Sequence, residues 1–102
     1  MAAAKKTAGA ETSPLRPVEV QGDTINVDDS KVNTWKTFEL SAVISDDGAN
    51  PHAKMQALFD LIEYVTDTDK QAIVDRFGGD GAVPTDVLAY AAELSQKIIS
   101  KN

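Results

Sequence analysis

The single histidine, His52, is the residue type most often used as an acid, a base or a metal ligand near neutral pH. It follows Pro51 in the first turn of a predicted helix. The chain has no cysteine, and no carboxylate precedes His52 at a helical spacing, so a zinc ligand set is not in place. A Ser–His–Asp triad would need an unspecified serine. We expect His52 to face solvent, and we assign no catalytic or metal-binding residue.

Three aspartates, Asp67, Asp69 and Asp75, have a spacing that invites comparison with a calcium-binding loop. Such a loop requires glycine at its sixth position and an acidic ligand at its twelfth. Counting from Asp67, these positions hold Ala72 and Gly78, so both requirements fail. Asp67 and Asp69 are better explained as the acidic opening of a short helix.

The glycine cluster at residues 78–81 could be compared with a phosphate-binding loop. Such loops precede a helix and supply a lysine or arginine. This cluster instead ends a helical pattern, contains Asp80 and leads into Val83-Pro84. It predicts a helix end followed by a turn, and no cofactor is expected.

Residues 33–64 hold the only tryptophan, Trp35, together with Phe38 and Phe59. One explanation of Trp35 and Phe38 is that they anchor a small hydrophobic core. The other is that they form part of an open face that binds a partner, since aromatic residues are frequent at binding hot spots. The sequence is compatible with both.

Composition favours one small domain. A chain of 102 residues buries only about 60–65% of the surface that its unfolded form exposes, which leaves little room for a deep enzyme cleft. The absence of cysteine suits a reducing cytoplasm, and we expect neither a secretory signal nor a membrane span. The net charge is −6, although residues 1–16 are basic, so nucleic acid and anionic lipid are disfavoured partners. The acidic charge can keep the chain dispersed or complement a basic partner.

Residues 1–17 are rich in small and polar side chains and are predicted to be a disordered arm, with folding on contact with a partner as the alternative. Residues 18–102 are predicted to form the folded domain. It opens with an alternating pattern at residues 18–27 that predicts a hairpin with a type II′ turn at Gly22-Asp23. We expect this hairpin to be an appendage that lies on the helices or pairs with a partner's strand.

A first helix is expected after Asn33 or Thr34, with its apolar stripe at Trp35, Phe38 and Ala42, and an end at residues 46–48. The alternative is a strand, because Thr, Trp, Phe, Val and Ile favour sheets.

Three further helices follow from caps and from apolar residues at three- and four-residue steps. The second begins at Asn50 and Pro51, the third follows Thr68, and the last follows Thr85. The predicted fold is mostly α: a small bundle of about four short helices with a disordered N-terminal arm and a short β-hairpin.

In the order of its elements, from about residue 32 to residue 102, the chain resembles the tail assembly chaperones of long-tailed bacteriophages, especially those of Gram-positive and actinobacterial hosts. The landmarks are TWKTFEL with Trp35, an acidic break, KMQALFDLIEYV, the FGGD stop at residues 77–80 and the amphipathic last helix. The Ala-rich start and the VEVQGDTINV hairpin have no counterpart that we can assign in that family.

The resemblance implies a non-enzymatic protein that coats the hydrophobic, helical tape measure protein in the host cytoplasm until the tail tube forms around it. It also implies a longer form made by ribosomal frameshifting, and Lys101-Asn102 is compatible with this because an adenine-rich slippery sequence can encode both residues. The resemblance leaves a homo-oligomer open. A chaperone of this kind needs apolar helix faces and a charged exterior. The candidate partner-binding residues are Trp35, Phe38, Met55, Phe59, Tyr90 and Leu94.

Two other functions stay open. A structural virion protein or head-to-tail adaptor would also suit short helices behind an extended arm. A small enzyme would have to work without His52.

Overall fold

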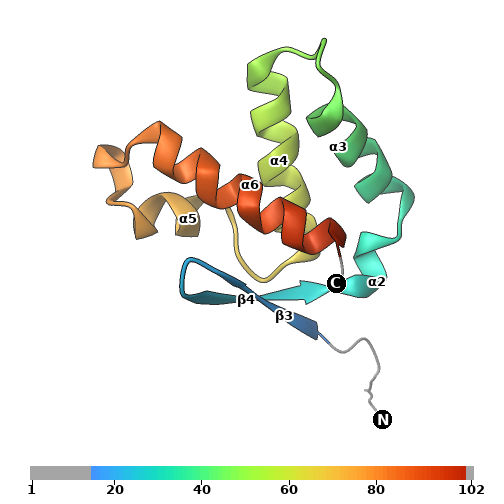
Figure 1. Ribbon diagram of the computed structural model, residues 1–102, viewed down its shortest axis with the longest axis horizontal. Helices are drawn as coiled ribbons and strands as arrows, with labels where there is room; N and C mark the ends of the chain where they lie inside the picture. The colour runs from blue at the N-terminus through green and yellow to red at the C-terminus, as the bar shows by residue number, and fades with distance from the viewer. Residues whose placement is uncertain (1–14, 101–102) are drawn as a thin grey trace.

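The computed structural model describes residues 15–100, and within them it is mostly helical with one antiparallel hairpin, as predicted (Figure 1). A one-turn helix between the hairpin and the first predicted helix was not anticipated. The elements in chain order are β3 Leu15–Val20, β4 Asp23–Asp28, α2 Asp29–Val32, α3 Trp35–Ser45, α4 Pro51–Val65, α5 Lys70–Arg76, the 3-10 turn η1 Gly79–Gly81 and α6 Pro84–Ser100.

The hairpin turn lies one residue earlier than predicted. Its loop is Gln21-Gly22, and both residues have positive φ, 50° and 88°, which is the type I′ geometry rather than type II′. Val18 pairs with Ile25 and Val20 with Asp23. In the predicted register Val18, Val20, Ile25 and Val27 would also share one face. The alternation of apolar and polar side chains therefore does not distinguish the predicted register from the observed one. The observed register brings Asp23 to Arg76 and Tyr90, which favours it.

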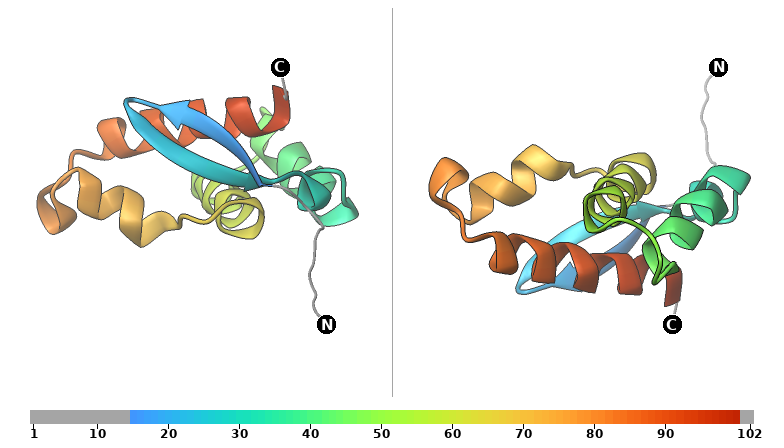
Figure 2. Two further views of the ribbon diagram at one scale, coloured as in Figure 1. Left: turned by 90° about the horizontal axis from the view of Figure 1, so that it is seen from below. Right: turned by 90° about the horizontal axis from the view of Figure 1, so that it is seen from above.

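The hairpin is part of the core, so the prediction of an appendage is wrong. Its inward side chains are buried, and Val20 and Val27 have no exposed surface. Figure 2 shows α6 lying along the hairpin, and β3 is the strand that packs against α6. The backbone of β4 is joined on its other side to the segment after α4, where Asp67 N–H donates to Asn26 C=O at 3.2 Å.

The boundary of the N-terminal arm also needs correction. Residues 15–17, assigned to a disordered arm, belong to β3, while residues 1–14 lie outside the described part of the chain. The strand begins early because Arg16 holds it: its Nε lies 3.0 Å from Asp29 Oδ2 and its Nη2 donates to Ile98 C=O at 3.0 Å. These bonds link the strand to α2 and to the last turn of α6.

The core lies where α4, α6 and the hairpin meet. A helix buries one stripe and a strand one face, and here three such surfaces face one another with α5 closing one end. The side chains with no exposed surface are Val20, Val27, Leu61, Ile62, Val65, Ala91, Leu94 and Ile98.

Helix starts follow capping residues, with two corrections. Thr34, one of two predicted alternatives, caps α3, and Asn50 caps α4, where Asn50 Oδ1 accepts from His52 N–H at 2.7 Å. The cap of α5 is Asp69 rather than Thr68, because its carboxylate accepts from Ala72 N–H at 2.8 Å.

The last helix begins at Pro84 rather than after Thr85. Proline suits the first helical position, and Val83 C=O already accepts from Val87 N–H at 3.2 Å. At the end of α5, Gly78 and Gly79 have φ of 109° and 66°, which confirms the predicted left-handed stop.

Candidate protein-binding surface

The helix α3 packs on α4 with the side opposite to its aromatic residues. Leu40 and Ile44 pack against the core, and Thr37 is buried. Trp35 and Phe38 lie on the other side, with 69% and 61% of their surfaces exposed. The explanation of these two residues as core anchors is therefore wrong.

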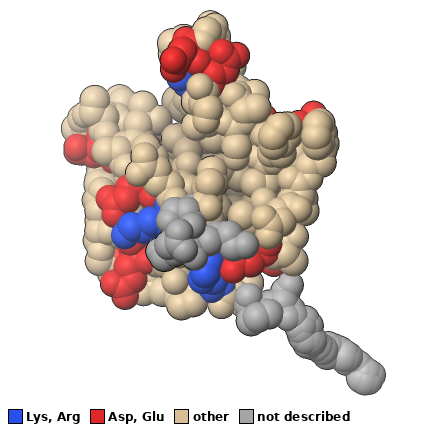
Figure 3. All heavy atoms as spheres, turned by 45° about the vertical axis from the view of Figure 1, so that its right-hand side comes forward, with Lys and Arg blue, Asp and Glu red and all other residues tan. Residues whose placement is uncertain are grey.

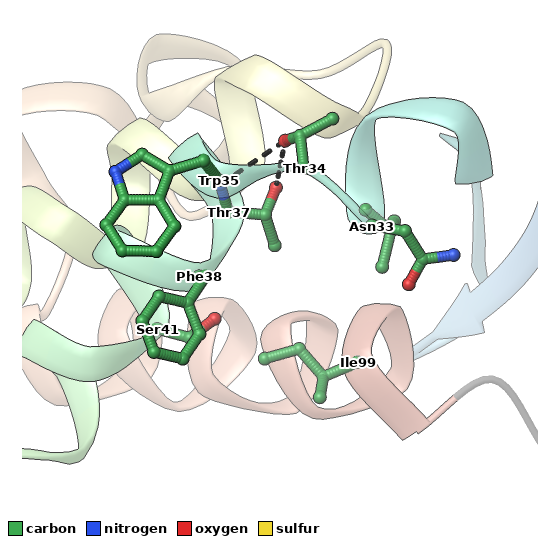
Figure 4. A pocket seen from close by; sticks show the side chains of 8 residues that line it. Asn33, Thr34, Trp35, Thr37, Phe38, Ser41 and Ile99 are labelled. Atoms are coloured by element: carbon green, nitrogen blue, oxygen red, sulfur yellow. Dashed lines mark hydrogen bonds between the residues drawn. The ribbon is translucent and has the colours of Figure 1, made fainter.

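Trp35 and Phe38 form a pair on this outer side. Their ring centroids are 5.1 Å apart, with the planes tilted by 34° (Figure 4). Ala42 and Ser45 continue the line at the next turns of the helix and are also exposed. We call these four residues the α3 stripe.

Polar contacts fix the rotation of α3 about its axis. The hydroxyls of Thr34 and Thr37 both donate to Lys31 C=O at 2.7 Å, and Thr34 Oγ1 lies 3.4 Å from Tyr64 Oη on α4. Lys31 and Lys36 place their ammonium groups 5.3 and 5.2 Å from the centre of the Tyr64 ring. These bonds turn Thr37 inward and leave the aromatic pair outside.

An apolar groove lies between α3 and the end of α6. Its first section, of about 540 Å³, runs from Val32 past Trp35 and Phe38 to Ile99, whose side chain in Figure 4 comes from α6 on the opposite side. A second hollow of about 460 Å³ shares Ser41 and Ile99 with the first. The second hollow is completed by Ile44, Ser45, Ser95 and Gln96. We call the two sections together the α3–α6 groove.

The face that carries the α3–α6 groove is largely uncharged. Figure 3 turns the α3 side of the molecule toward the viewer and shows a broad surface without charged side chains, with carboxylates and a few lysine or arginine side chains around it. Contiguous exposed apolar surface rimmed by polar residues marks sites of protein interaction.

Two other predicted residues lie away from this surface. Met55 is half-buried and Phe59 is only 4% exposed. They line a separate apolar hollow of about 220 Å³ between α4, α5 and α6. Both side chains line this hollow, and Met55 is the more exposed of the two.

Tyr90 and Leu94 belong to the core, so neither presents a partner-binding surface. Leu94 has no exposed surface, and Tyr90 has 2%. The Tyr90 hydroxyl donates to Asp23 Oδ2 at 2.8 Å, and Arg76 also binds this carboxylate. Burial, and then this hydrogen bond, raise the pKa of Tyr90 to about 12. The hydrogen bond from Tyr90, followed by the one from Arg76, lowers the pKa of Asp23.

Ile99 lines the groove, although the sequence pattern did not mark it as a binding residue. It follows the buried Ile98 in α6 and is 47% exposed. Adjacent helix positions differ by about 100° in direction, so Ile99 points to a different side of α6 from Ile98, which is buried in the core. That spacing was the available signal.

Asp67 and Asp69, first considered as calcium ligands, accept hydrogen bonds within the fold. His52 is exposed in the first turn of α4. Asp67 accepts from the N–H and the side-chain amide of Asn26 at 3.1 and 3.0 Å. In the part of the chain that the structure describes, no three His, Cys, Asp or Glu side chains gather in a way that could hold a metal ion. None of the helices there has the length and apolar character needed to cross a membrane.

Comparison with known protein families, with curated proteins and with solved structures finds no match to this chain.

Proposed function

We propose that this protein binds an apolar helical segment of another protein through the α3 stripe and the α3–α6 groove. The observation that carries the proposal is the exposed Trp35–Phe38 pair at the mouth of that groove. Aromatic side chains of this size dominate binding energy where they become buried at an interface. Burying one of them contributes about 1.5–3 kcal/mol, so leaving both in water is a substantial loss that a partner recovers.

The shape of the surface supports a helix as the ligand. An amphipathic helix binds a groove through residues at three- and four-residue steps. The α3 stripe follows this spacing, and the small residues Ala42, Ser41 and Ser45 allow a second helix to approach closely. Two helices in contact lie about 8–10 Å apart, which requires small side chains somewhere along the line of contact.

Together with the sequence resemblance, this surface supports the function of a phage tail assembly chaperone. In this proposal the client is the tape measure protein, and the chaperone keeps its apolar helices from aggregating in the host cytoplasm. The net charge of −6 then keeps the pair dispersed.

Co-expression tests the proposal. The tape measure protein of the same phage, or a helical segment of it, is produced with and without this chain, and its soluble fraction is measured. We expect the wild-type chain to raise that fraction and to co-purify with the segment. Phe38→Ser should lose both effects without unfolding, because Phe38 is 61% exposed.

Val83→Ser is the matched control, since Val83 is 52% exposed on the loop before α6 and outside the groove. A segment that is equally insoluble and unbound with or without the chain would rule the function out. Presence of the chain at a fixed copy number in purified particles would instead support the alternative of a structural virion protein or head-to-tail adaptor.

A further inference from the structure

Two carboxylates follow one flank of the α3 stripe. Glu39 lies on α3, and Asp46, seven positions later, is the C-cap residue of this helix, where its Oδ1 accepts from Gly48 N–H at 2.9 Å. Both are exposed, and within residues 15–100 neither takes part in an ion pair. Asp47, also exposed, extends the negative charge beyond the end of α3.

Among residues 15–100, the remaining surroundings of the stripe place no cation in an ion pair with this flank. On the opposite side the groove is bordered by the uncharged Gln96 and Ile99 of α6. Lys36, the cation on α3 itself, lies with its ammonium over the Tyr64 ring on α4. A helix seated on the stripe therefore meets negative charge along one edge and neutral side chains along the other.

A second copy of the chain fits this surface poorly. Pairing two α3 stripes about a two-fold axis sets the aromatic end of one against the small residues of the other, which suits their shapes. The same arrangement brings the two Glu39 side chains together near the axis, and like charges so placed oppose association. Each copy also carries a net charge of −6.

We propose that the occupant of the α3 stripe is an amphipathic helix of another protein whose apolar residues are flanked, at a seven-residue spacing, by lysine or arginine facing Glu39 and Asp46. This inference rests on the proposed function and adds the charge pattern of the client. Charges at the rim of an interface select the partner and speed its association, while the apolar residues supply most of the affinity.

Fluorescence of Trp35, the only tryptophan in the chain, tests the inference at the site itself. The full chain is titrated with two synthetic helical peptides, free of tryptophan, that share one leucine and alanine stripe. One carries lysine and the other glutamate at the flanking positions. We expect a blue shift of the emission with both peptides and an affinity about tenfold higher for the lysine peptide at low salt.

Charge reversal on the protein provides the second arm. Glu39→Lys should abolish or reverse the preference, because it replaces the facing charge at an exposed position. Asp80→Lys makes the same change in net charge in the η1 turn, far from α3 in Figure 1, and should keep the preference. Circular dichroism confirms that both variants remain folded.

Equal affinities for the two peptides, a preference for the glutamate peptide, or equal effects of Glu39→Lys and Asp80→Lys would overturn the inference. The first two results would leave helix binding at the stripe intact. An unchanged Trp35 emission with both peptides would also overturn it, and the proposed function would then be decided by the co-expression result alone.

Discussion

At the scale of single residues, large aromatic side chains occupy two opposite environments in this chain. Trp35 and Phe38 lie in water, while Tyr90 is buried with its hydroxyl bonded to Asp23. The difference follows from their neighbours. Tyr90 has both an apolar surrounding and an acceptor within reach, whereas α3 already fills its inner side with Leu40 and Ile44.

The Tyr90 hydroxyl should contribute to stability in a pH-dependent way. Its pKa is raised from 10.0 to about 12, so the folded state favours the protonated form. The contribution is complete below pH 10 and is lost as pH rises through about 12. We expect Tyr90→Phe to lower the free energy of unfolding by about 1 kcal/mol at neutral pH. Its stability should also fall less steeply than that of the wild type in alkali.

Urea unfolding at a series of pH values measures both effects, with Tyr64→Phe as the control for loss of the other tyrosine hydroxyl. Parallel alkaline curves for wild type and Tyr90→Phe would contradict the assigned role. In acid the sign is opposite for Asp23. Its pKa lies below 3.8, so its carboxylate stabilises the fold above that pH and loses the contribution as pH falls.

At the scale of elements, the hairpin has two edges that are already engaged. On β4, Asn26 exchanges backbone and side-chain hydrogen bonds with Asp67. The backbone N–H and C=O of Asn26 therefore point away from β3. Pro17, which pairs with Asn26, points its backbone C=O away from β4 at the opposite edge of the hairpin. Pro17 has no N–H to donate at this edge. The C=O of Glu19, two positions later on the same strand, accepts from Lys97 Nζ. Addition of a partner's strand, one of the alternatives raised by the sequence, is disfavoured at both edges.

The hairpin turn is a site where stability can be gained. Gln21 has a φ of 50°, a left-handed conformation that asparagine and glycine adopt at lower cost. We expect Gln21→Asn to raise the free energy of unfolding by about 0.5 kcal/mol. The backbone carbonyl of residue 21 would keep its hydrogen bond from Arg76.

Thermal and urea unfolding measure the change. Thr24→Asn, at an exposed strand position beside the turn, controls for the new side chain and should be neutral or slightly destabilising. A Gln21→Asn variant no more stable than the wild type would show that the turn is not strained.

At the scale of the whole molecule, the hairpin, α4 and α6 share one hydrophobic core, and α3 packs on it with only one side. The α3 stripe and the groove can therefore be open without leaving the core incomplete. A binding surface built this way can lose its aromatic residues and still fold.

Valine truncations test whether the hairpin belongs to that core. Val20 and Val27 have no exposed surface, so Val20→Ala and Val27→Ala should each cost about 2 kcal/mol of unfolding free energy. Val83→Ala, at a 52% exposed position, should change it by less than about 0.5 kcal/mol. Urea unfolding followed by circular dichroism gives all three values. Small effects at Val20 and Val27 would mean that the hairpin is an appendage after all.

The sequence by itself determined where α3 and α4 begin and where α5 ends. Thr34, Asn50, Pro51 and the glycines after α5 act on backbone groups within a few residues, so their effect can be read locally. The lack of cysteine and the single histidine, His52, were likewise readable from the sequence alone.

Only the tertiary structure decided which apolar side chains face water. In α3, one side carries Trp35 and Phe38 and the other carries Leu40 and Ile44. The apolar pattern of this helix therefore does not indicate which of the two sides is buried. Phe59, Tyr90 and Leu94 were assigned to a surface and lie in the core, and the hairpin register was shifted. The physical reason is that burial is a competition among all apolar faces for one limited core, and its outcome depends on contacts between residues far apart in the chain.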